Sequence, residues 1–324
     1  MMQPEEKRAN PLAGPAAAEL QPGPRGSLRT YLLASFGIAW VFQIAGSACA
    51  LAGVPMGFTV LLMLCMFGPM LAVCITCRGL SFAKSGIRGW RPRFRGHWAH
   101  WLIAWLSPMV LTVLGCVCFF AAFPARFDPT ASSYLRAAVG DAVYESLYAS
   151  VPTAAYAAQM LGTCLLGAFI NTVPALGEEA GWRGWMYPHL KARLGQTGGR
   201  IAGGLIWGVW HWPVMILTGY EYGWSVWNAP LYLVALGCVS FCLITVALGT
   251  LLDALYEKTG SIWAPALFHG AFNAVASAGL MFLQAEYAAD TLLGPSAVGL
   301  LTALPMLVIA CVLLVRGLRQ ESRL

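Results

Sequence analysis

The chain has 324 residues, of which 58% are hydrophobic and only 10% are charged; its formal net charge is +6 and its mean hydropathy is +0.66. Soluble globular domains carry about 25% charged residues, so this composition excludes a soluble protein and predicts an all-α, polytopic membrane protein. The Lys and Arg residues follow the segments between apolar runs, as expected for membrane topology. The composition therefore predicts a lipid bilayer as partner and no nucleic acid.

The N-terminal segment 1–30 holds five prolines, both signs of charge and no long apolar run. We expect a disordered cytoplasmic tail here, and no signal peptide, because a signal peptide needs an apolar core region. The remainder, 31–324, is expected to form one multi-pass membrane domain, since the segments between its apolar runs are too short to make a second, soluble domain.

The membrane domain contains about eight apolar segments that reach or approach the roughly 20 residues needed to cross a bilayer. They cover residues 31–52, 57–77, 98–123, 160–186, 201–219, 230–251, 261–282 and 296–315. The stretch 127–158 allows two interpretations, an amphipathic interfacial helix or an earlier start of the fourth span. All ten cysteines lie within or beside apolar runs, where Cys acts as a small hydrophobic residue, so no disulfide framework is expected.

The distribution of Lys and Arg predicts the orientation of the chain. With eight spans, 18 of the 20 basic residues lie on one side of the membrane, and only Arg126 and Arg136 lie on the other. By the positive-inside rule both termini are then cytoplasmic, which agrees with an even number of spans. Because the sequence has no organelle signal, we expect the plasma membrane.

Three of the apolar spans contain polar side chains that are costly to place in a bilayer, roughly 2.5–3.5 kcal/mol for an acid at a helix centre. These residues are Glu178, Glu179 and Arg183 in the fourth span, His211 in the fifth, and His269 and Asn273 in the seventh. A rise of 1.5 Å per residue places them about 12–15 Å from the cytoplasmic ends of their spans. We therefore expect one active site inside the bundle, near its cytoplasmic side.

The spacing in the fourth span separates two roles for its acids. Glu179 and Arg183 are four residues apart with the acid first, so they can pair on one helix face. Glu178 points about 100° away from that pair and stays available as a general base that activates water. His211 is a second group that could polarise a water molecule or bind a metal ion.

The seventh span supplies a pair of hydrogen-bonding side chains. His269 and Asn273 are four residues apart and project from one helix face. Such a pair suits the stabilisation of an oxyanion, although it could also join two helices through a hydrogen bond of about 0.6 kcal/mol. A water activator and an oxyanion site together are the minimum for hydrolysis of an amide bond.

Taken in order, the patterns Glu-Glu-x-x-x-Arg, aromatic-x-x-x-His and His-x-x-x-Asn resemble those of the CAAX protease and bacteriocin-processing (CPBP, or Abi) family. This family includes the type II CAAX prenyl endopeptidases, which are intramembrane proteases. The resemblance covers roughly residues 160–280 and implies a catalytic core there. It implies a substrate that is a peptide or a membrane-anchored protein.

The resemblance also implies roles for individual residues. Glu178 would be the water-activating base, assisted by His211, and the Glu179–Arg183 pair would support the site. The His-x-x-x-Asn pair would stabilise the oxyanion. Trp207 stands where the family usually has Phe; it retains an aromatic wall of the substrate pocket but could narrow that pocket.

The residues leave metal dependence open. Glu178, His211 and His269 could supply a zinc site with an open position for water. A metal-free mechanism that depends on the glutamate fits the same residues equally well.

Two other functions are compatible with polar residues inside a membrane. A proton- or ion-coupled transporter would place ionisable side chains at this depth, but it would also be expected to show inverted repeats, and the sequence has no convincing repeat. A non-proteolytic scaffold or immunity protein could retain the same fold without cleaving a substrate.

Overall fold

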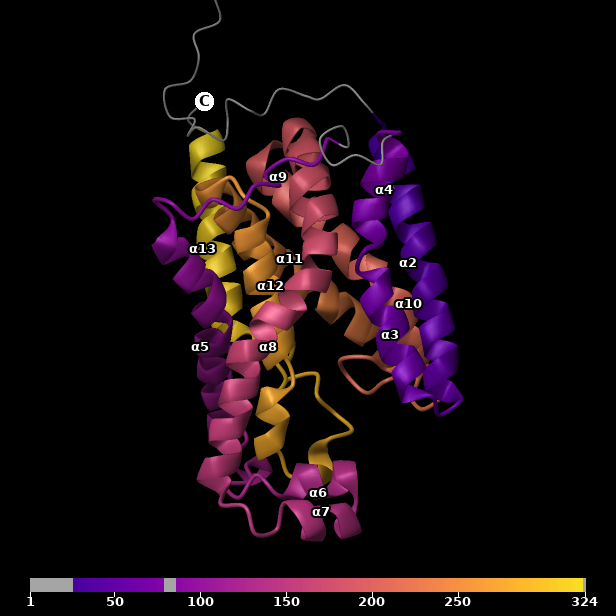
Figure 1. The fold of residues 1–324 in the computed structure, drawn as a ribbon, viewed down its shortest axis with the longest axis vertical. Coiled ribbons are helices and arrows are strands. Elements are labelled where there is room, and N and C mark those ends of the chain that lie inside the picture. Colours follow the sequence, from indigo (N-terminus) through magenta and orange to yellow (C-terminus); the bar gives the residue numbers. More distant parts are fainter. Residues whose placement is uncertain (1–25, 79–85, 323–324) are drawn as a thin grey trace, which may run out of the picture.

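The structure is a computed structural model that describes residues 26–78 and 86–322. Every named element in these two ranges is a helix, which confirms the all-α membrane class (Figure 1). Most of the expected tail, residues 1–25, lies outside the described residues. The first helix already begins at Leu28, where the Ser27 hydroxyl accepts a hydrogen bond of 3.0 Å from the Thr30 backbone N–H and caps the helix.

The first three expected spans form helices α2 (Leu28–Leu51), α3 with α4 (Pro55–Cys65 and Gly68–Thr76) and α5 (Trp98–Ala122). The second span is in two pieces because Pro69 at the start of α4 has no N–H to continue the hydrogen bonding of α3. Helices α2, α3 and α4 pack together on one side of the molecule, and α5 lies on the opposite side (Figure 1).

The stretch 127–158 combines parts of both interpretations. It forms two short helices, α6 (Ser133–Val139) and α7 (Asp141–Leu147), at one end of the molecule, and the fourth span then begins with α8 (Thr153–Gly181). The span therefore starts seven residues before the expected boundary at residue 160.

Helix α8 continues through a π-helical turn (Trp182–Met186) into α9 (Tyr187–Trp210). At Gly195 the backbone has φ 74° and ψ 174°, a conformation that only glycine adopts easily, and this residue divides α9 into two helical parts. The second part carries the fifth span, which ends with the short helix α10 (Trp212–Thr218).

The last three expected spans correspond to α11 (Leu231–Thr259), α12 (Trp263–Val275) and α13 (Leu304–Glu321). Helix α12 has only 13 residues, so the seventh span is shorter than the expected 261–282. Five helical stretches in the described residues are long and apolar enough to cross a membrane by length and composition, and one of them, Thr153–Thr218, includes the break in α9. The count of eight spans stays a prediction.

Four helices in the middle of the molecule, α8, α9, α11 and α12, pack closely through glycines. A Cβ atom at Gly270 of α12 would lie 2.5 Å from the Thr172 nitrogen and 2.7 Å from the Ala168 oxygen of α8. A Cβ at Gly204 of α9 would overlap the Val246 backbone of α11. Small residues let membrane helices approach this closely, and the approach brings all the motif residues to one place.

Candidate active site

Glu178 lies in the last turn of α8 and is only 2% exposed. Its Oε2 atom accepts two hydrogen bonds from indole N–H groups, one from Trp182 at 3.0 Å and one from Trp207 at 2.8 Å. Because both bonds go to the same oxygen, Oε1 remains available for another partner. The carboxylate is thus held in place without using its full capacity to accept hydrogen bonds.

Glu179 connects three helices behind Glu178. Its Oε1 atom lies 3.0 Å from Nη1 of Arg183, which confirms the expected ion pair, and 3.0 Å from Nδ1 of His269 on α12. Arg183 also donates from Nη2 to the Gly249 carbonyl of α11 at 3.2 Å. Glu179 and Arg183 are fully buried, and His269 is 4% exposed. The ion pair therefore fixes the imidazole of His269 and leaves Nε2 as its only free ring nitrogen.

His211 lies at the junction of α9 and α10. Its Nδ1 atom is 2.9 Å from the Trp207 carbonyl oxygen, and its ring packs edge-on against Trp210 and Phe241 at centroid distances of 4.7 and 5.0 Å. A nitrogen that faces a carbonyl oxygen must carry the proton, so in the neutral ring Nε2 is an acceptor. His211 can therefore accept a hydrogen bond from a water molecule.

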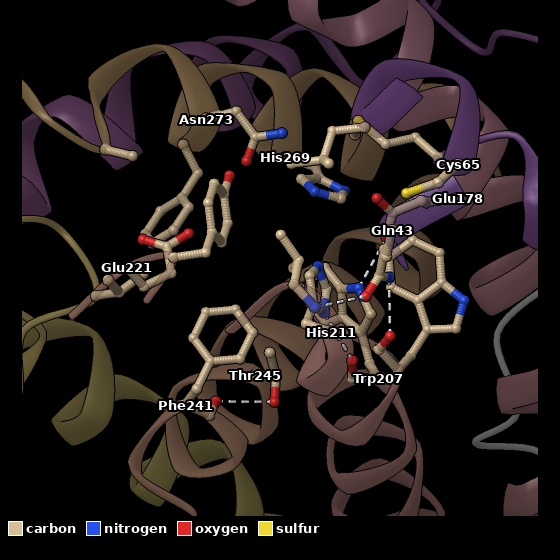
Figure 2. Close-up of a pocket in the computed structure, with 18 of the residues that line it drawn as sticks. Gln43, Cys65, Glu178, Trp207, His211, Glu221, Phe241, Thr245, His269 and Asn273 are labelled. Atoms are coloured by element: carbon tan, nitrogen blue, oxygen red, sulfur yellow. Dashed lines mark hydrogen bonds between the residues drawn. The ribbon is translucent and has the colours of Figure 1, made fainter. Parts of the chain in front are cut away.

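The motif residues meet at a cavity of about 340 Å³ (Figure 2). Its walls include five of the expected residues, Glu178, Trp207, His211, His269 and Asn273. Asn273 follows His269 by one turn of α12, and Figure 2 shows the two side chains next to each other along the same wall. Glu179 and Arg183 do not line the cavity and lie behind its wall, and their supporting role stays a prediction.

The arrangement does not fit the expected zinc ligands. Glu178, His211 and His269 all line the cavity, and each has one free donor atom. Within residues 26–78 and 86–322, however, no three His, Cys, Asp or Glu side chains are grouped so that they could hold one metal ion. We therefore derive no step through a metal ion.

Three residues of the site were missed or underestimated in the sequence. The Trp207 indole donates to Glu178, which a Phe could not do. Gln43 of α2 is 1% exposed; its side chain donates to the Trp210 carbonyl at 2.9 Å and accepts from the Val214 backbone N–H at 3.3 Å. The sequence feature that could have identified it is an amide side chain within an apolar run. Glu221 also lines the cavity, and it was passed over because it lies in the segment between two expected spans.

Comparison with known proteins agrees with this geometry. Residues 158–275, which contain all three motifs, match the family model of the Rce1-like type II CAAX prenyl endopeptidases. A 64-residue segment is 30% identical to CAAX prenyl protease 2 of Methanococcus maripaludis, covering 20% of this chain and 23% of that protein. The chain thus spans less than a quarter of the length of the curated relative it matches. The expected resemblance is confirmed for the part of the chain that builds the cavity.

Proposed function

We propose that the protein is an intramembrane endopeptidase that hydrolyses a peptide bond in a membrane-associated peptide or protein. The observation that carries this proposal is the carboxylate of Glu178, held on one oxygen by Trp182 and Trp207 and free on the other beside a cavity. A positioned general base contributes about 10²–10⁴-fold to a reaction rate. The Rce1-like match over residues 158–275 supports the same class of reaction.

In the proposed reaction, Oε1 of Glu178 takes a proton from a water molecule whose oxygen attacks the peptide carbonyl carbon. His211 orients this water by accepting its second hydrogen at Nε2. The C–N bond then breaks as Glu178 returns the proton to the leaving nitrogen, so the glutamate is regenerated.

The oxyanion of the tetrahedral intermediate needs hydrogen-bond donors that are already in place. The side-chain amide of Asn273 supplies one donor from the cavity wall. His269 supplies a second from Nε2 when both of its ring nitrogens carry protons, and Glu179 holds the ring through Nδ1. The ion pair behind the wall therefore acts through His269 and does not itself contact the substrate.

The proposal extends to the orientation of the protein in the membrane and to the kind of substrate. Both termini would be cytoplasmic, in a plasma membrane, so that the cavity lies nearer the cytoplasmic side. The substrate would be either a C-terminal segment processed as in CAAX proteins or a peptide linked to bacteriocin maturation or immunity.

The test compares the wild-type protein with Glu178→Gln, purified in detergent, on quenched fluorescent peptides. We expect cleavage to fall by about 10²–10⁴-fold while the unfolding temperature stays close to that of the wild type. Glu145→Gln, which changes an exposed glutamate on α7, is the matched control and should cleave normally.

Chelation and zinc re-addition are part of the same assay. Activity that survives chelation would support the metal-free glutamate mechanism, and activity that is lost and then restored by zinc would support a metalloprotease. Full activity of Glu178→Gln would contradict the proposed mechanism. If no variant cleaves any peptide although all are folded, a non-proteolytic scaffold becomes the better interpretation.

A further inference from the structure

The cavity contains a second carboxylate that the proposed reaction does not use. Glu221 lies in the loop between α10 and α11, and Figure 2 shows it across the cavity from Glu178. Within the described parts of the chain, Glu221 takes part in no ion pair. Its charge is therefore available to a molecule that enters the cavity.

The other lining residues leave the cavity negative. Among the residues that the structure describes, the acids in its walls are Glu178 and Glu221, and none of the lining residues is Lys or Arg. Arg183 is fully buried and is paired with Glu179 behind the wall, so it does not offset the two cavity carboxylates. A cleft lined by one sign of charge, with apolar walls, concentrates ligands of the opposite sign.

The backbone holds Glu221 in an unfavourable conformation. Its φ is 77°, in the left-handed region that disfavours residues with a Cβ atom. The flanking glycines Gly219 (φ 72°) and Gly223 (φ 78°) close a tight turn, and Thr291 donates to the Glu221 carbonyl at 3.0 Å. Glycine would adopt this conformation without strain, so the glutamate side chain has no local structural reason to be here.

We propose that Glu221 is a specificity-determining residue that binds a cationic group of the substrate, either a Lys or Arg side chain or a free N-terminal ammonium. The proposal rests on the function proposed above, with Glu178 acting on the peptide bond while Glu221 holds the cation on the opposite wall. Phe58 and Phe241 also line the cavity, and aromatic rings attract a nearby cation.

Binding can be measured without cleavage in the Glu178→Gln background. The probes are fluorescein-labelled hexapeptides of Ala and Leu with one Lys, norleucine or Glu moved through the six positions, each with a free or an acetylated N-terminus. For at least one position, or for the free N-terminus, we expect the cationic peptide to bind about tenfold more tightly than its neutral counterpart.

Two substitutions at the same position separate charge from structure. Glu221→Gln keeps the shape of the side chain, and Glu221→Gly removes both the carboxylate and the backbone strain. Added to Glu178→Gln, both should reduce the cationic preference to less than about twofold and leave the affinity for norleucine peptides unchanged. Glu145→Gln in the same background is the matched control and should keep the full preference.

Two results would overturn the inference. One is that cationic peptides bind no more tightly than neutral ones at any position. The other is that Glu221→Gln keeps the preference or weakens all peptides equally, as a purely structural residue would. Because the readout is binding, a protein that cleaves nothing but prefers cations through Glu221 would refute the proposed function and not this inference.

Discussion

Two clusters of charged residues, the buried site and a partly buried ion network, are neighbours in the structure and differ in how fully they are bonded. In the α9–α11 ion network (Lys191, Arg200, Asp253 and Glu257), each acid contacts both cations at 2.8–2.9 Å. In the site, the hydrogen bonds found among the described residues use one oxygen of Glu178 and one ring nitrogen each of His211 and His269.

The two clusters are neighbours along α11. Arg183 bonds to the Gly249 carbonyl, and Asp253 of the ion network follows Gly249 by four residues, about one turn. Of these two clusters, the site borders the cavity and the ion network does not. A buried charge alone therefore does not mark an active site, whereas hydrogen-bonding atoms left free beside a cavity do.

The largest effect on folding should come from the ion network. Asp253→Ala removes a fully buried carboxylate and leaves two cations with one partner, so we expect the free energy of unfolding to fall by about 3–5 kcal/mol. Denaturant unfolding in detergent would measure this loss. Glu257→Gln changes a side chain that is 37% exposed and should cost less than about 1 kcal/mol.

Loss of cleavage in Asp253→Ala, with the unfolding free energy of the wild type, would contradict the distinction between a structural ion network and the active site. That result would make the ion network a part of the reaction.

A smaller effect, on activity, is expected for Trp207→Phe. This change keeps the aromatic wall and removes only the indole N–H that bonds Glu178, so we expect about a tenfold loss of cleavage, equivalent to about 1.4 kcal/mol. Steady-state cleavage of the peptides used for Glu178→Gln would measure it. Trp227→Phe, at a tryptophan that is 65% exposed, should have no effect. Equal activity of the two variants would show that the hydrogen bond does not position the carboxylate.

The smallest effect is a pH dependence of the cation preference. Burial raises the pKa of Glu221 to about 7, so its carboxylate is mostly protonated at pH 6 and mostly ionised at pH 8. The preference for Lys over norleucine peptides, measured in the Glu178→Gln background, should therefore increase several-fold from pH 6 to pH 8.

Other titratable groups face the same space and need a control. Cys65, His211, Tyr220 and His269 line the cavity beside Glu178 itself, and the buried Tyr222 follows Glu221 directly in the chain. In Glu178→Gln with Glu221→Gln these groups remain, so any pH dependence that persists belongs to them. A preference that is equally strong at pH 6 and pH 8 would contradict the assignment to Glu221.

The sequence was sufficient to find the ionisable residues of the three spans and the Glu179–Arg183 ion pair, but not Gln43, Glu221 or the hydrogen bonds between helices. Ionisable side chains stand out in an apolar run because their burial is costly, and this identified Glu178, His211 and His269. The hydrogen bond from Trp207 depends on how α8 and α9 are rotated against each other, which no spacing within one helix reports. Glu221 gave no signal because a glutamate in a loop is ordinary until the fold turns the loop toward the cavity.

The fold was predictable where apolar runs coincide with helices, and less so elsewhere. Residues 276–303 are apolar, but they form only short 3₁₀ turns before α13. Apolar content indicates burial and not a helix, and Gly279 is packed so closely against the Pro295 backbone that a Cβ atom there would overlap it. The sequence placed an interruption between the fourth and fifth spans, and Gly195 lies within it, but the helical residues 187–194 that precede this glycine were not expected.

The π-helical turn Trp182–Met186 determines which face of the helix the residues after it occupy. Arg183, Tyr187 and Lys191 all contact α11, at Gly249 and Asp253, although they are spaced four residues apart. In a regular α-helix each step of four residues overshoots a full turn by about 40°, so the contacts would drift off one face. The wider π turn takes up this drift. One continuous helix can therefore present a single face to both the Glu179–Arg183 ion pair and the ion network, and deleting one residue from this turn would rotate everything beyond it by about 100°.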